Sequence, residues 1–93
     1  MKFGWTEAKR AKTLRERGLD FGRATEVFAG LHVTRATHGG RSGENRFMTA
    51  GYLDGRLIVM VWTPRGDLRH VMSMRYAHAK ETKLWKEEMD RFR

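Results

Sequence analysis

The stretch that decides the fold covers residues 55–77 and reads GRLIVMVWTPRGDLRHVMSMRYA. Its first part, residues 56–62, is almost entirely apolar after the arginine, which is typical of a strand covered on both faces. Residues 63–67 have the Pro, Gly and Asp content of a turn, and residues 68–76 return as a second strand. The stretch therefore predicts an antiparallel strand pair near the centre of a sheet.

The sequence just upstream adds two more strands to this pair. Asp54-Gly55 is a two-residue hairpin signal, so residues 46–53 are predicted to pair with the apolar strand. Residues 31–36 form a further, modest strand. Between these two strands, residues 38–44 contain three glycines and are predicted to be a loop.

Helical patterns flank the strands. The first predicted helix runs from Glu7 to about Arg17, with Thr6 as its N-cap and Gly18 at its end. A second, short helix follows the cap residue Asp20 and ends at Gly30.

A third helix begins near His78, and its apolar side is Leu84, Trp85, Met89 and Phe92. The order α-α-β-β-β-β-α keeps helices and strands in separate runs, which favours an α+β fold. We predict one domain over residues 1–93, with two N-terminal helices, a four-stranded mainly antiparallel sheet and a C-terminal helix.

Composition excludes several classes of site. The chain has 93 residues and no cysteine, so a disulfide framework and a thiolate metal site are both excluded. Its four histidines lack the i, i+4 spacing of a helical zinc motif. No apolar run reaches the length of a membrane span. The expectation is a cytoplasmic protein with no metal, no cofactor and no membrane contact.

The charge of the chain predicts an acidic partner. Nineteen Lys and Arg against eleven Asp and Glu give a net charge of +8, which favours nucleic acid or an acidic protein. The largest local excess lies in residues 1–23, with seven basic and three acidic side chains. A smaller excess lies in residues 65–75. RNA is the first candidate for the partner.

Strict alternation along residues 68–76 assigns their side chains to two faces. One face would carry Leu68, His70, Met72, Met74 and Tyr76, and the other Arg69, Val71, Ser73 and Arg75. Because the preceding strand is apolar on both faces, the arginines would lie beside a covered strand. We predict that they converge with Arg65 of the turn on one open cleft.

Several motifs in order resemble the BrnT toxins of bacterial type II toxin–antitoxin pairs. They are Trp5…Lys9…Arg17-Gly18…Phe21…Ala24…Val27-Phe28, Gly43-Glu44-Asn45-Arg46-Phe47, Asp54-Gly55-Arg56, Thr63-x-Arg65-Gly66 and Ser73-Met74-Arg75-x-Ala77. The resemblance covers nearly the whole chain. It departs from the family pattern at Tyr76, where a basic residue is usual, and at His70, where an arginine is usual.

The resemblance implies a RelE-like ribonuclease fold and an endoribonuclease that cleaves mRNA and arrests growth. It also implies neutralisation by a BrnA-like ribbon-helix-helix antitoxin, with operator DNA bound only through that antitoxin. A toxin–antitoxin heterotetramer is one possible assembly. The competing hypothesis is a non-catalytic basic module that binds nucleic acid or protein.

Metal-free RNA cleavage needs an acid, a base and fixed cations around the phosphate. The catalytic candidates are Arg75, Arg65, His70 and Tyr76. Arg75 would clamp phosphate, or else form a salt bridge with Glu81. Arg65 would reach substrate, or else only solubilise the turn. His70 would transfer a proton, or else lie in the core. Tyr76 would stack on a base or donate a proton.

The candidates for RNA binding are Arg46, Arg69, Glu44, Lys9 and Lys12. Glu44 and Arg46 would contact RNA or antitoxin, or else form a structural ion pair. The lysines belong to the basic first helix, which would follow a phosphate backbone or meet an acidic antitoxin. Both interpretations remain open from the sequence.

Overall fold

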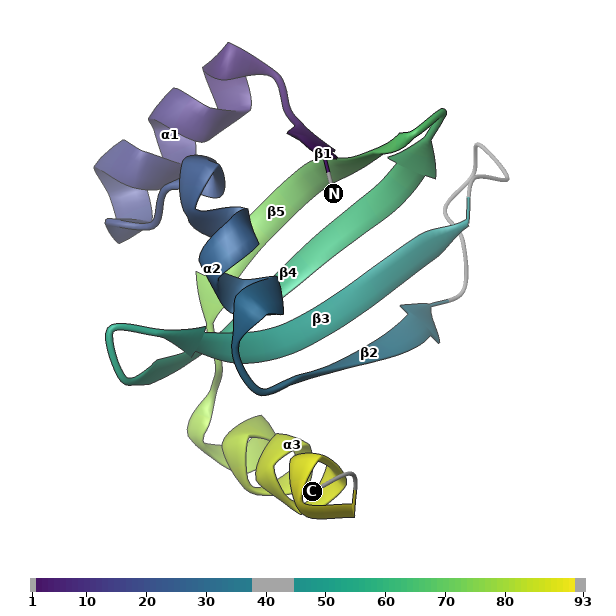
Figure 1. The fold of residues 1–93 in the computed structure, drawn as a ribbon. Coiled ribbons are helices and arrows are strands. Elements are labelled where there is room, and N and C mark those ends of the chain that lie inside the picture. Colours follow the sequence, from purple (N-terminus) through teal and green to yellow (C-terminus); the bar gives the residue numbers. More distant parts are fainter. Residues whose placement is uncertain (1, 38–44, 92–93) are drawn as a thin grey trace.

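The computed structural model describes residues 2–37 and 45–91 and contains one five-stranded sheet with helices on both faces (Figure 1). The elements, in chain order, are β1 (Lys2–Gly4), α1 (Glu7–Arg17), η1 (Phe21–Arg23), α2 (Ala24–Ala29), β2 (His32–Thr37), β3 (Arg46–Leu53), β4 (Arg56–Arg65), β5 (Leu68–Tyr76) and α3 (Ala79–Arg91). The predicted loop at 38–44, with His38 and Glu44, and the predicted helix residue Phe92 lie outside the described residues.

The α+β class is confirmed, but the predicted four-stranded sheet is one strand short. The strand order is β1-β5-β4-β3-β2, and β1 pairs in parallel with β5, so the sheet is mixed. The pairing joins Lys2 to Leu68 and Gly4 to His70. Three residues are too few to show a strand period in the sequence, and only the tertiary pairing makes β1 a strand.

The predicted turn between the two central strands is also too long. β4 continues to Arg65, and Pro64 pairs with Arg69, so only Gly66 and Asp67 form the turn. Gly66 has φ +60°, which favours glycine. The fixed φ of proline is compatible with extended backbone, so Pro64 did not end the strand.

The two faces of the sheet have separate cores. The α2 face carries a cluster that contains Phe21, Val27, Met60 and Met74, and the α3 face carries a cluster that contains Val59 and the α3 residues Trp85 and Met89. Figure 1 shows α2 across one face of the sheet and α1 beside the edge at β5, with α3 set apart from them below the strands. The names α2 face and α3 face are used below in this sense.

Helix α1 is attached by polar contacts, because none of its residues is buried. Its Thr6 cap accepts from the Lys9 N–H at 3.4 Å, and Gly18 ends it at φ 70°. Arg10 pairs with Asp20 at 2.7 Å, and Arg17 donates to the Met74 carbonyl of β5 at 2.9 Å. These contacts place α1 along the outer edge of β5.

Candidate active site

A β-bulge in β5 reorganises the side chains of this strand. Val61 of β4 pairs with Ser73, whereas the next residue, Trp62, pairs with Val71. Met72 is therefore an extra residue with no partner of its own in the register. An inserted residue of this kind reverses the alternation of side chains beyond it.

The strict alternation predicted for residues 68–76 is consequently wrong beyond Val71. Val71 and Met74 are both fully buried in the core of the α2 face, although their numbers differ by three. Ser73 pairs with Val61, and Arg75 pairs with Val59, both on the α3 face. The bulge thus brings His70, which pairs with Thr63, onto the same face as Ser73 and Arg75.

Arg46 joins this face from β3. Its neighbour Phe47 stacks on Trp62 on the α2 face, with ring centroids 4.8 Å apart, so Arg46 points to the α3 face. The pairing of Phe47 with Trp62 places Arg46 beside Thr63, and Thr63 pairs with His70. We call Arg46, Thr63 and His70 the cationic row. The Cα atoms of Arg46 and His70 are two inter-strand spacings apart, which corresponds to about 10 Å.

Thr63 fixes the centre of the cationic row. It is only 1% exposed, and its hydroxyl donates to the Asn45 carbonyl at 2.6 Å. This bond ties β4 to the residue that precedes Arg46. The Nε of Arg46 is buried and has no hydrogen-bond partner among the described residues. Within residues 2–37 and 45–91, the Nε–H of Arg46 therefore has no acceptor.

The cationic row lies on the part of the α3 face that α3 does not bury. Val59 and Ala50, which pack under α3, are 1% and 0% exposed. Two residues further along the same strands, Val61 and Met48 are half-buried. His70 and Arg46 are half-buried as well. Partly exposed apolar side chains therefore lie next to the cationic row.

Arg75 is held by an acid of the protein itself. Its guanidinium makes a two-pronged ion pair with Glu81 of α3, in which the Nη2 to Oε2 distance is 3.2 Å. Glu81 also accepts the His78 N–H at 2.6 Å, which caps the start of α3. The Arg75 bond lowers the pKa of the Glu81 carboxyl to about 2. The salt-bridge alternative for Arg75 is confirmed.

Replacing Glu81 by glutamine is expected to lower the free energy of unfolding at neutral pH by about 1–3 kcal/mol, because the carboxylate charge that strengthens the bond to Arg75 is lost. A carboxyl pKa depressed from 4.5 to about 2 stabilises the fold above pH 4.5 and ceases to do so as pH falls toward 2. The difference in free energy of unfolding between wild type and variant, measured in urea, should therefore disappear over that pH range. The exposed Glu87→Gln serves as control. A difference that stays constant with pH would contradict this account.

The remaining strand arginine lies on the opposite face. Arg69 is stacked between Phe28 and Trp62, with its Cζ 4.3 and 4.6 Å from the ring centroids. Burial lowers the pKa of Arg69. Tyr76 is also on the α2 face, where the Arg56 guanidinium lies 3.7 Å from its ring centroid. The predicted convergence of Arg69 and Arg75 on one cleft is therefore wrong.

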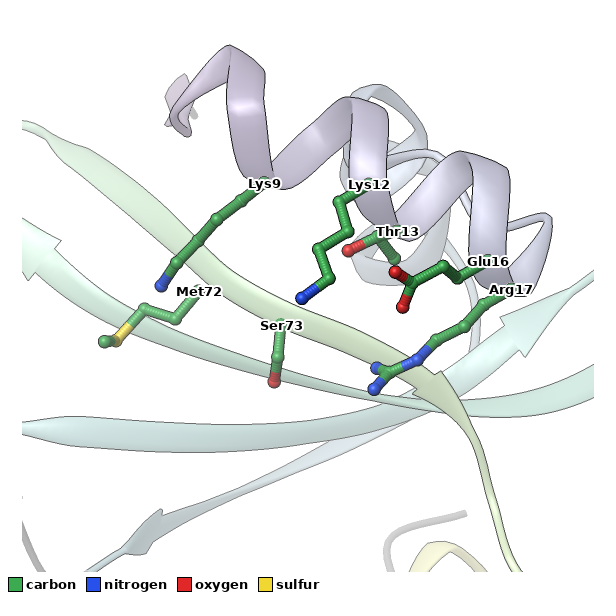
Figure 2. Close-up of a pocket in the computed structure, with 7 residues that line it drawn as sticks. All are labelled: Lys9, Lys12, Thr13, Glu16, Arg17, Met72 and Ser73. Atoms are coloured by element: carbon green, nitrogen blue, oxygen red, sulfur yellow. The ribbon is translucent and has the colours of Figure 1, made fainter.

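Three other predicted residues lie at the margins of the α3 face. Arg65 is exposed at the end of β4, two residues beyond Thr63. Lys9 and Lys12 extend from α1 toward β5, where they line a groove with Met72 and Ser73 (Figure 2). Ser73 and Thr63 had no site role in the sequence interpretation, although both lie in motifs that carry the family resemblance.

Within residues 2–37 and 45–91, no group of three or more His, Cys, Asp or Glu side chains is placed to hold a metal ion. The helices of this part of the chain are all too short or too polar to cross a membrane.

Comparison with known proteins gives a match over most of the chain. Residues 5–81 match the family model described as "Ribonuclease toxin, BrnT, of type II toxin-antitoxin system". The matched span includes the whole cationic row, the bulge and the Arg75–Glu81 pair. No curated protein matches the chain.

Proposed function

Because the chain belongs to the BrnT family of ribonuclease toxins of type II toxin–antitoxin systems, we propose that it cleaves mRNA without a metal ion, at the cationic row. The observation that carries this proposal is the placement of His70 and Arg46 on one partly exposed sheet face, on either side of Thr63. This pair supplies an acid–base group and a permanent cation at one site.

In the proposed reaction, the 2′-hydroxyl of RNA attacks the adjacent phosphorus. The new O2′–P bond forms as the P–O5′ bond breaks, which leaves a 2′,3′-cyclic phosphate and a 5′-hydroxyl. One proton leaves the 2′-oxygen and one is delivered to the 5′-oxygen. His70 transfers one of these protons, since imidazole serves as either acid or base near neutral pH.

Arg46 stabilises the extra negative charge on the phosphate oxygens. A guanidinium suits this role because it stays protonated and presents paired donors to two oxygens. Arg75 lies on the same face, but its donors are engaged by Glu81. We therefore assign Arg75 to holding α3 against the sheet beside the site, and Arg65 to contacting RNA beyond the cationic row.

We further propose that the antitoxin is BrnA-like, with a ribbon-helix-helix part that binds operator DNA, and that the toxin acts in the cytoplasm. The net charge of +8 supports an acidic partner surface on the antitoxin. A heterotetramer of two toxins and two antitoxins is the assembly that the family resemblance suggests.

Cleavage of a defined RNA by the purified, antitoxin-free protein tests the proposed reaction. Cleavage should proceed in EDTA and yield 2′,3′-cyclic phosphate and 5′-hydroxyl ends. An RNA with a single 2′-deoxy nucleotide at the cleaved bond should resist, because the nucleophile is missing. Products with a 5′-phosphate, or activity that EDTA abolishes, would overturn the mechanism. Binding without cleavage would instead favour a non-catalytic module.

A further inference from the structure

A surface groove runs between α1 and the outer edge of β5, away from the cationic row. Its volume is about 180 Å³, and it is lined by Lys9, Lys12, Thr13, Glu16, Arg17, Met72 and Ser73. Figure 2 shows the two lysines and the arginine extending from α1 toward the strand. Three cations against one carboxylate make the groove basic.

The lysines of the groove are not neutralised within the described part of the chain. Ion pairs there engage several other cations, among them Lys2 with Asp67, Arg10 with Asp20 and Arg23 with Asp54. Neither Lys9 nor Lys12 forms an ion pair among residues 2–37 and 45–91, and both are exposed. The positive charge of the groove therefore remains available to a ligand.

The groove adjoins backbone that no strand of the described residues covers. β1 pairs only with residues 68–70 of β5, so beyond His70 the outer edge of β5 faces α1. Arg17 donates to the Met74 carbonyl at this edge, which shows that side chains of α1 reach the strand. The bulge inserts Met72 next to Ser73, and both residues line the groove.

We propose that this groove binds backbone phosphates of the RNA strand next to the cleaved bond, an inference that rests on the proposed function. Lys9 and Lys12 are three residues apart on one helix and thus point to the same side, which suits successive phosphates of an extended strand. Ser73 lines the groove and also lies on the α3 face with His70. A strand in the groove therefore continues over Ser73 to the cationic row.

The chemistry of the groove favours RNA over an acidic protein as its occupant. The cores of protein–protein interfaces are depleted in lysine and enriched in aromatic side chains. Apart from Arg17 and Met72, which are types also enriched at protein interfaces, the groove has two lysines, a glutamate, a serine and a threonine, and it has no aromatic side chain. Binding of a phosphate backbone needs cations and hydrogen-bond donors spaced along the strand, and the side chains of the groove provide them.

The test uses 2′-O-methyl RNA, which has no free 2′-hydroxyl and so reports binding without cleavage. Affinity is measured against salt concentration for wild type, for Lys9→Gln/Lys12→Gln and for the control Lys83→Gln/Lys86→Gln. The control removes two exposed lysines at the same spacing from α3. Loss of two phosphate contacts should lower the slope of log K against log salt by about 1.4 in the groove variant and leave the control near wild type.

An unchanged slope in the groove variant, or an equal fall in the control, would overturn the groove assignment. A groove variant that loses binding to poly-glutamate but keeps its RNA affinity would also overturn it, in favour of a protein-binding surface. If wild type shows the expected slopes but cleaves no unmodified RNA, the groove assignment stands and the nuclease proposal fails. If wild type cleaves RNA and the groove variant binds normally, only the groove assignment fails.

Discussion

Replacing His70 by glutamine is expected to slow RNA cleavage by about 10²–10⁴-fold, the range for loss of a positioned acid–base group. Glutamine is close to histidine in size and still donates a hydrogen bond, so the pairing of residue 70 with Thr63 should persist. The loss should fall on kcat, because proton transfer belongs to the transition state and not to substrate binding. Single-turnover cleavage of a defined RNA measures it directly.

The pH dependence of cleavage provides a second readout for His70. Histidine is the side chain that ordinarily changes charge between about pH 5 and 8. The change of cleavage rate with pH in that range should therefore disappear in His70→Gln. His78→Gln, an exposed histidine at the start of α3, is the matched control and should keep both rate and profile. A His70→Gln enzyme with the wild-type rate would remove His70 from the mechanism.

The central strand pair was predictable because its sequence permits few alternatives. An apolar run over residues 57–62 has to be covered on both faces, and the Asp54-Gly55 signal fixes the hairpin that precedes it. The structure has the corresponding turn there, with Asp54 at φ 52° and Gly55 at φ 77°. The pairing of Arg75 with Glu81 was also open to prediction, as one of two alternatives.

The bulge could not be predicted from the pattern. Residues 71–74 read Val-Met-Ser-Met, so apolar side chains occur at both odd and even positions. One alternation would bury Met72 and Met74 and the other Val71 with Ser73, and the sequence does not say which residue is inserted. The register with β4 decides it, because Val71 must pack beside Trp62 and Met74 beside Met60. The position of His70 relative to Arg75 depends on that choice.

The environment of Arg69 could not be predicted from the sequence for a related reason. Its two aromatic neighbours, Phe28 and Trp62, come from α2 and β4, and no local spacing relates them to residue 69. A guanidinium between two rings looks in the sequence like any other strand arginine. The faces of the sheet, and not the count of arginines, therefore separate the candidates for catalysis from those for stability.

Replacing Arg46 by glutamine is expected to lower kcat by about 10²–10³-fold, as for loss of one preorganised donor to a developing negative charge. Arg46→Lys should restore only part of the rate, since an ammonium keeps the charge but not the paired donors. The buried Nε of Arg46 has no partner in the described residues, and leaving such a donor unpaired costs about 1–3 kcal/mol. A phosphate oxygen of the substrate would satisfy this donor, but the Nη1 of Arg69 is also buried without a partner among the described residues, so kinetics must separate the two arginines.

Arg69→Gln is the matched control, because it removes the same charge from the other face of the sheet. It should lose the stacking on Phe28 and Trp62, and hence stability, while kcat of the folded fraction stays near wild type. We expect kcat of the two variants to separate a catalytic role from a stabilising one. Each kcat is normalised to the folded fraction measured by urea unfolding. A larger fall in kcat for Arg69→Gln than for Arg46→Gln would move the site to the α2 face, and Tyr76 would then become the residue to test beside it.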